Sequence, residues 1–183
     1  MYLFKDWETT GFKKSGPLVQ DGQARGCQVA YLFTDENGNS LAEFAALIEP
    51  KGWTVGEGAQ AVHGFTTEFC ELYGVNIKAA LGTYLSLAKR AKLVIAHNAE
   101  FDCNITEIEC AYAGVHPPAT PRYCTMLNAA TPCGLPGNKW PKLEEALQIL
   151  CGKTIDKAHD ALYDVRACRD IFFELKNRGL VAA

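Results

Sequence analysis

The sequence lacks the cysteine spacing on which protein zinc sites and redox centres are built. It contains eight cysteines in 183 residues, but no two of them form a C-x-x-C pair. Several, such as Cys103, Cys110 and Cys168, fall within apolar helical patterns, where an unpaired cysteine behaves as a small hydrophobic side chain. The spacing therefore favours core packing over a zinc-binding or redox role.

Long apolar runs are also absent. No stretch approaches the roughly 20 consecutive apolar residues of a membrane-spanning helix. The first apolar run already contains Lys5, Asp6 and Glu8, which does not fit a secretory signal. We therefore expect a cytoplasmic protein that does not associate with membranes.

The sequence has no excess of positive charge. Lys and Arg number 18 against 21 Asp and Glu, a formal net charge of -3 at pH 7, which argues against a broad basic surface for binding nucleic acid nonspecifically. A local site is not excluded, because divalent cations held by acidic side chains can bind phosphate groups. With 48% hydrophobic residues, the composition is that of one globular domain, which we expect over residues 1–183.

The order of the predicted elements indicates an α/β fold. An apolar run from Tyr2 and two β-rich runs joined by a loop containing Asn-Gly predict an antiparallel three-stranded meander. Later strands alternate with helices, so we expect a mixed five-stranded sheet flanked by helices. The predicted strands lie at 27–34, 41–48, 93–96 and 122–125. The predicted helices lie at 66–73, 76–91 (with Asn76 as N-cap), 100–113 (ended by Gly114), 142–151 and 160–178. Residues 13–26, rich in Gly, Lys and polar residues, predict a flexible loop, and further loops are expected around His63 and at 131–142.

Two acids, Asp6 and Glu8, end the first strand. Because side chains alternate faces along a strand, both carboxylates point to one side while Trp7 faces the other. Such a pair can also be no more than a solvated strand terminus, and only two later stretches give it weight. Lys5, directly before the first acid, is unusual in a central strand; one explanation is that its aliphatic stem carries the ammonium group to solvent.

The later acids lie close to element boundaries. Asp102 lies one turn into the helix that follows the strand at 93–96, near the sheet edge where the sites of α/β proteins gather. Asp164 lies on the shoulder of the buried face of its helix and needs a partner there. His159 is five residues earlier, a rotation of about 140° on a helix, so it must precede the helix, where it suits a proton acceptor. Asp160 is a predicted N-cap.

Three stretches together resemble the three motifs of the DEDDh exonucleases, the DnaQ-like 3′–5′ exonucleases of ribonuclease H-like fold. The stretches are DWETTG at 6–11, HNAEFD at 97–102 and HDALYD at 159–164, in the order and spacing of the family, and the resemblance extends over roughly residues 1–176. It implies a ribonuclease H-like sheet, with a three-stranded antiparallel meander plus parallel strands, and a metal-dependent hydrolase that acts on phosphodiester bonds.

The resemblance implies a site for two metal ions. Carboxylates brought close together repel one another, by about 4 kcal/mol per pair at ~4 Å, unless cations neutralise them. By this resemblance, two Mg²⁺ or Mn²⁺ ions would clamp the scissile phosphate, and His159 would accept the proton of the attacking water. The four metal ligands would be Asp6, Glu8, Asp102 and Asp164.

The resemblance also implies a pocket for the 3′-terminal nucleotide. Thr10 and the backbone after Glu8 would meet the 3′-hydroxyl, and Phe12 would wedge against the last base. Phe12 and Phe101 are equally compatible with ordinary core packing, and the lysines of the 13–26 loop are either solvated or in contact with the substrate strand. The substrate-binding candidates are Thr9, Thr10, Gly11, Phe12, His63, Asn98 and Phe101.

The leading hypothesis is an exonuclease that removes nucleoside 5′-monophosphates from single-stranded or frayed 3′ ends, with DNA favoured over RNA. The same chemistry on short RNA is the alternative within the enzyme class, and a non-catalytic module that binds nucleic-acid ends is the alternative outside it. The chain ends shortly after the last predicted helix, so we expect no tail like the one through which epsilon-type subunits bind their polymerase. A homodimer is left open.

Overall fold

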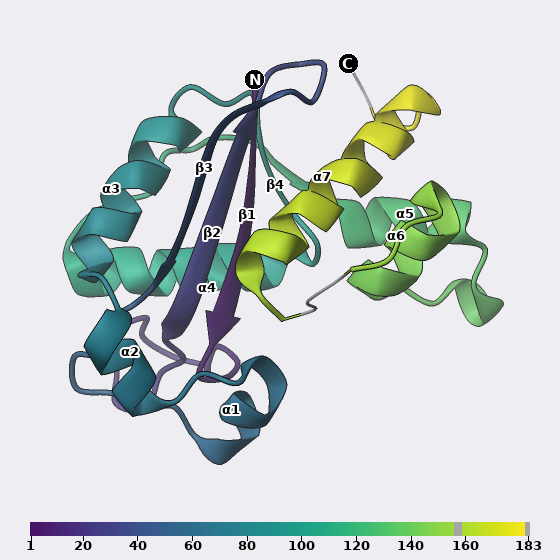
Figure 1. The fold of residues 1–183 in the computed structure, drawn as a ribbon. Helices are drawn as coiled ribbons and strands as arrows, with labels where there is room; N and C mark the ends of the chain where they lie inside the picture. The colour runs from purple at the N-terminus through teal and green to yellow at the C-terminus, as the bar shows by residue number, and fades with distance from the viewer. Residues whose placement is uncertain (156–158, 182–183) are drawn as a thin grey trace.

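The computed structural model describes residues 1–155 and 159–181, which form one mixed β-sheet with helices on both faces (Figure 1). The strand order is β3-β2-β1-β4-β5, with β1 in the centre. This arrangement confirms the predicted fold class, an antiparallel meander extended by parallel strands. The strands are β1 (Tyr2–Thr9), β2 (Gly26–Thr34), β3 (Ser40–Leu47), β4 (Leu93–Ala96) and β5 (Arg122–Cys124).

The pairing of β1 decides where the sheet has a free edge. β1 runs antiparallel to β2 along its whole length, from Tyr2 opposite Thr34 to Thr9 opposite Gly26. Its pairing with the parallel strand β4 is shorter and ends at Phe4. The second half of β1 therefore has an edge that β4 does not cover, and other elements can bond to it there.

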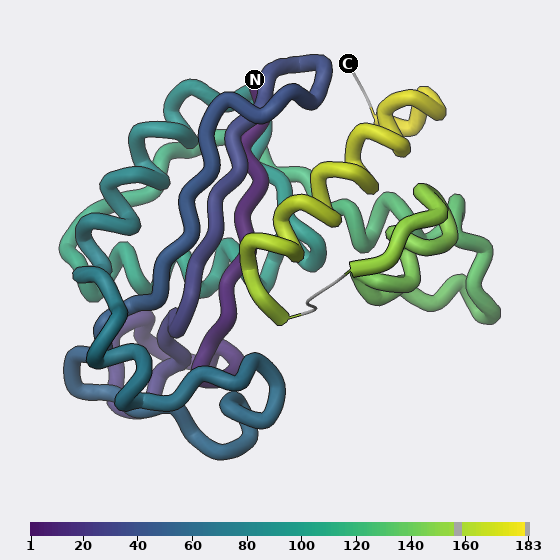
Figure 2. Tube along the Cα trace, in the orientation of Figure 1, coloured from purple at the N-terminus to yellow at the C-terminus, as the bar shows by residue number. Residues whose placement is uncertain are grey.

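Helices cover both faces of the sheet. Helices α3 and α4 pack on one face, where Leu3 and Trp7 of β1 join a core cluster, and α7 packs on the other face against Tyr2 and Phe4. Figure 2 follows the chain in the same view, with α7 crossing in front of the sheet and α4 behind it. The helices are α1 (Glu57–His63), α2 (Thr67–Tyr73), α3 (Ile77–Ala88), α4 (Ala99–Ala113), α5 (Thr125–Cys133), α6 (Leu143–Cys151) and α7 (Ala161–Asn177), with a 3₁₀ turn at Pro136–Asn138.

Local capping rules account for the ends of several helices. Asn76 accepts a hydrogen bond from the backbone N–H of Lys78 at the start of α3, and Asp160 caps α7 in the same way. Gly114 ends α4 in the left-handed conformation, with φ of 70°. All three capping predictions are thus confirmed.

The cysteines fill the interior, as their spacing predicts. All eight are free thiols, and six of them are buried. Cys110 and Cys168 are members of core clusters. None of the helices in the described ranges combines the length and apolar character that crossing a bilayer requires.

Two helices were not expected from the sequence. Residues of α1 were assigned to a loop, and α5 occupies a stretch for which a strand ending at 125 and a loop from 131 were predicted. α1 spans only seven residues and begins with a glycine-rich stretch, so its periodicity is weak. In α5, Pro132 lies inside the helix, and a proline argues against a helix at the sequence level because it lacks the N–H that bonds back to the carbonyl of residue i−4. The strand prediction fails at Thr125, which begins the helix.

Candidate active site

The two acids of the first motif lie on the face of β1 that α7 covers. Tyr2 and Phe4 point to this face and pack against α7, and the alternation of the strand continues to Asp6 and Glu8. Glu8 is buried, with 8% of its surface exposed, and Asp6 is half-buried. Trp7 points to the opposite face and is buried there, as predicted from strand geometry.

Asp102 reaches the same edge from the opposite helical layer. It lies in the first turn of α4 and is buried, and its Oδ1 accepts a hydrogen bond of 3.0 Å from the backbone N–H of Trp7. This bond is possible because the pairing of β1 with β4 ends at Phe4. The carboxylate therefore takes the place that a neighbouring strand would otherwise occupy.

The third motif lies at the start of α7. Asp164 is buried in the first turn, and its Oδ2 accepts a hydrogen bond of 3.3 Å from the backbone N–H of His159. His159 precedes the helix, as predicted, in a turn with φ of 66°, and its side chain is exposed. One ligand atom from each of Glu8, His159 and Asp164 lies within 4.8 Å of the others.

The electrostatics of the four acids are those of a cation site. Burial raises the pKa of Asp6 well above its ordinary value, and the other three carboxylates raise it further. Burial also raises the pKa of Glu8 to about 7, with nearby Asp164 adding to the shift. Burial likewise raises the pKa values of Asp102 and Asp164 to about 7.

The donor set fits a divalent cation. The second oxygen of Asp164, Oδ1, is buried and has no hydrogen-bond partner among the described residues. Burying a carboxylate oxygen without a partner is costly, unless the oxygen binds a ligand such as a cation. Hard oxygen ligands of this kind suit Mg²⁺ or Mn²⁺.

A cavity of about 270 Å³ opens directly beside Glu8. Phe12 is 82% exposed, so the prediction that it could be a core residue is wrong. Its ring meets that of Phe101 edge to face, with centroids 5.7 Å apart, and Phe101 also packs against the core. Six of the seven substrate-binding candidates line this cavity: Thr9, Thr10, Gly11, Phe12, His63 and Phe101.

Asn98 is the candidate that does not line this cavity. It is exposed, with φ of 73°, and borders a separate hollow of about 260 Å³, which Phe12 and Phe101 also line. Lys13 and Asn104 line the same hollow and are bonded to each other at 2.9 Å. Phe12 and Phe101 thus line both openings.

His63 is the last residue of α1 and is buried at the cavity wall. Its Nδ1 accepts a hydrogen bond of 3.1 Å from the backbone N–H of Phe65, and its buried Nε2 has no partner in the described part of the chain. Burial lowers its pKa, so the ring is neutral at pH 7. Sequence reasoning missed the rest of this wall, Gly58, Ala59 and Val62, because α1 itself was not predicted.

His97, the first residue of the second motif, joins three segments. Its Nδ1 lies 3.0 Å from Thr125 Oγ1 and its Nε2 lies 3.0 Å from the backbone oxygen of Pro141. Burial lowers its pKa to about 4, so the ring is neutral and its Nε2 donates. The contacts link the end of β4 to α5 and to the loop before α6. No feature of the sequence alone marked this role.

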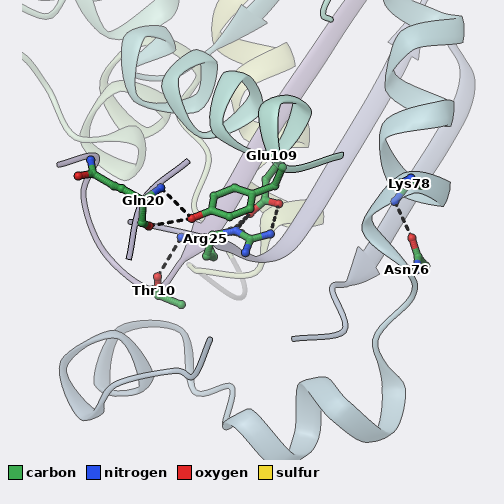
Figure 3. A network of polar contacts seen from close by, with 8 residues as sticks. Thr10, Gln20, Arg25, Asn76, Lys78 and Glu109 are labelled. Atoms are coloured by element: carbon green, nitrogen blue, oxygen red, sulfur yellow. Dashed lines mark hydrogen bonds and ion pairs between the residues drawn. The ribbon is translucent and has the colours of Figure 1, made fainter. Parts of the chain in front are cut away.

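The loop between β1 and β2 is anchored, although its composition predicted a flexible segment. The Thr10 hydroxyl accepts a hydrogen bond of 3.0 Å from the Arg25 backbone N–H, and the Arg25 guanidinium binds both carboxylate oxygens of Glu109 on α4 (Figure 3). The Arg25 guanidinium also lies 3.9 Å from the ring centroid of Tyr112, whose hydroxyl donates to the Gln20 backbone oxygen. These bonds fix Thr10 at the cavity wall.

The chain belongs to the exonuclease family. A family model described as Exonuclease (RNase_T) matches residues 3–172, which is most of the chain. Together with the sheet topology, this match identifies the domain as a DEDDh-type, DnaQ-like exonuclease domain, as the three motifs predicted. No curated protein matches the chain.

Solved structures of exonucleases share the fold. A structure of exonuclease I has a TM-score of 0.79 and 23% identity, with 98% of this chain and 42% of that chain covered. The zinc-bound complex of E. coli exonuclease I with single-stranded DNA has a TM-score of 0.78 and 25% identity, with 97% and 40% covered. Exonuclease X in complex with 5′ overhanging duplex DNA has a TM-score of 0.72 and 20% identity, with 100% and 95% covered.

The extent of these matches differs between the two relatives. The chain spans about two fifths of the exonuclease I chains but nearly the full length of exonuclease X. At these identities the likeness to solved structures establishes the fold, and the activity has to be argued from the site.

Proposed function

We propose that the protein is a metal-dependent 3′–5′ exonuclease that hydrolyses the terminal phosphodiester bond of single-stranded or frayed DNA and releases nucleoside 5′-monophosphates. The observation that carries this proposal is the meeting of acids from three elements beside one open cavity. Burial and mutual repulsion raise their pKa values, and the cavity has an exposed aromatic ring at its mouth. Such a site suits a phosphate held by cations and a base held by stacking.

The acids would hold the cations. Asp6, Glu8, Asp102 and Asp164 are the proposed ligands, and the unpartnered Oδ1 of Asp164 is free to accept one. When bound, the cations would lower the pKa of the attacking water and stabilise the leaving 3′ oxygen. The protein supplies the spacing of the ligands through β1, α4 and α7.

His159 is the proposed proton acceptor. Its side chain is exposed at the turn before α7, within reach of the Asp164 and Glu8 carboxylates. A neutral imidazole is suited to taking a proton from water near pH 7. Its place on a turn, with only its backbone N–H bonded to Asp164, lets the ring move without disturbing the acids.

The cavity is proposed to hold the 3′-terminal nucleotide. Phe12 and Phe101 present an aromatic edge and face on which a base can stack, and stacking tolerates any base. Thr10 is fixed by Arg25 at the wall and would meet the 3′-hydroxyl. The neutral His63, with a free Nε2, can hydrogen-bond the sugar or base.

DNA is the proposed substrate because the relatives of this fold have been seen with it. E. coli exonuclease I has been solved with dA16 and dT13 oligonucleotides, and exonuclease X with duplex DNA. Short RNA is the second candidate, since a phosphate held by cations and a base held by stacking are common to both kinds of nucleic acid. Action in the cytoplasm, without a membrane, is also a proposal.

A time course on matched 5′-labelled DNA and RNA oligonucleotides, in Mg²⁺, Mn²⁺ and EDTA, tests the proposal. We expect a ladder that shortens from the 3′ end only with metal, and faster on DNA. Asp164→Ala should abolish it, and His159→Ala should slow turnover by about 10² to 10⁴ without weakening substrate binding.

The matched control is Asp170→Asn, which changes an acid on the same helix that pairs with Lys153 at the surface, and which should retain full activity. Cleavage by Asp164→Ala at the wild-type rate would contradict the assignment of the site. Absence of cleavage by the wild-type protein with either metal would favour the non-catalytic alternative.

A further inference from the structure

Lys5 lies on the face of β1 opposite to the acids and is buried, with 1% of its surface exposed. The expectation that its stem reaches solvent is therefore wrong. Its Nζ donates to Thr106 Oγ1 at 2.7 Å and to the backbone oxygen of Asp102 at 3.2 Å, and lies 5.1 Å from the centroid of the Tyr84 ring. A buried ammonium group is costly unless its donors are used, so these bonds are what makes a lysine tolerable in a central strand.

Thr106 joins both sequence neighbours of Asp6 to α4. Its hydroxyl accepts from Lys5 and, at 3.0 Å, from the indole Nε1 of Trp7, and it donates to the backbone oxygen of Asp102 at 2.7 Å. The backbone N–H of Trp7 in turn donates to Asp102 Oδ1. The residues immediately before and after Asp6 are thus both bonded to the helical turn that contains Asp102.

These bonds matter because no strand in the described ranges pairs with β1 beside Asp6 on the side where α4 lies. The pairing of β1 with β4 has ended at Phe4, so the distance between Asp6 and Asp102 depends on side-chain bonds. Metal ligands have to be held to within about 0.5 Å of their working positions. Groups that orient ligands without touching the metal typically change metal affinity by about 10- to 100-fold when they are removed.

We propose that Lys5 and Thr106 are positioning residues that fix the spacing between Asp6 and Asp102 and thereby set the affinity of the site for divalent cations. This inference rests on the proposed function. It assigns a purpose to Lys5, which directly precedes the first motif and is unusual in a central strand, and to the bond between the Trp7 indole and Thr106.

Calorimetric titration of Mn²⁺ into the full chain, with the thermal midpoint from circular dichroism, tests the proposal. Lys5→Met keeps the length and burial of the side chain, and Thr106→Val keeps its shape, while each removes the hydrogen bonds. At temperatures well below its own thermal midpoint, we expect each variant to bind Mn²⁺ at least about 10-fold more weakly than the wild-type protein. At saturating Mn²⁺, the KM for a labelled oligonucleotide should be unchanged. Combined, the two changes should weaken binding by less than the product of the single effects, because they act on one network.

Ile108→Val is the matched control. It removes one methyl group from a buried side chain on the same helix, in the cluster that packs on β1, and should lower the thermal midpoint while leaving Mn²⁺ affinity unchanged. Wild-type Mn²⁺ affinity in both Lys5→Met and Thr106→Val, with a lower midpoint, would show a purely structural role and overturn this inference alone. If Lys5→Met does not fold, Thr106→Val decides. Absence of Mn²⁺ binding by the wild-type protein would refute the proposed function first and this inference with it.

Discussion

The clustered acids make the stability of the metal-free protein depend on pH. An acid with a higher pKa in the folded chain holds its proton more tightly there, so ionisation costs folding free energy. For Glu8, whose pKa rises from 4.5 to about 7, the cost is absent below pH 4.5, grows as the pH rises, and is complete above pH 7. At 1.36 kcal/mol per pKa unit it amounts to about 3 kcal/mol.

The same direction holds for Asp102 and Asp164, whose pKa values also rise to about 7 because they are buried. The three costs do not add, since protonation of one acid relieves the others, so we take the single value of about 3 kcal/mol as the expected effect. His97 acts in the opposite direction, because its lowered pKa of about 4 gives stability that is lost as the pH falls below ~6.5.

The measurement is urea unfolding in EDTA and in excess Mg²⁺ at pH 5 and at pH 8, followed by the fluorescence of the three tryptophans. At each pH, the free energy of unfolding in EDTA is subtracted from that in Mg²⁺. The contribution of His97 is the same in both and cancels. We expect Mg²⁺ to stabilise the protein at pH 8, where the acids are ionised and about 3 kcal/mol of ionisation cost is present for it to offset. We expect almost no stabilisation at pH 5, where the acids hold protons. Asp164→Asn should reduce the stabilisation by Mg²⁺ at pH 8, and Asp170→Asn should leave it unchanged. Equal stabilisation by Mg²⁺ at both pH values would refute the argument.

Three further substitutions have defined outcomes. Phe12→Ala should raise KM for a single-stranded oligonucleotide by about 10-fold, from the loss of one stacked base, with an unchanged thermal midpoint because Phe12 is 82% exposed; an unchanged KM would remove Phe12 from the binding surface. Gly26→Ala should destabilise the fold by about 1 to 3 kcal/mol in urea, because a Cβ there would lie 2.3 Å from the Trp7 ring; wild-type stability would mean that the ring moves freely. Gln28→Leu removes the acceptor of the Ala161 N–H, a buried bond of 2.9 Å at the start of α7, and should cost about 1 to 3 kcal/mol; a change within error would show that water replaces it.

Much of the candidate site could be predicted from local rules. The alternation of a strand places Asp6 and Glu8 on one face and Trp7 on the other, and the rotation of a helix requires His159 to precede α7. Both inferences need only residues a few positions apart, and the structure agrees with both. The order of the three motifs was sufficient to indicate the family.

The parts that were missed depend on contacts between distant residues. α1 was assigned to a loop because its seven residues have little periodicity, yet it supplies a wall of the cavity. Lys5 was expected at solvent, because nothing within the strand indicates that Thr106, 101 residues away, would accept its hydrogen bond. The anchoring of the 13–26 loop likewise depends on Glu109, which lies 84 residues beyond Arg25.

The sequence by itself determined which residues are candidates for the site of this protein and on which face of their own element they lie. Only the tertiary structure decided how they meet. Asp102 belongs to the helical layer on the far side of the sheet and reaches the acids of β1 because the pairing with β4 stops at Phe4. The length of a strand pairing is set by packing across the whole sheet, and local sequence contains no signal for it.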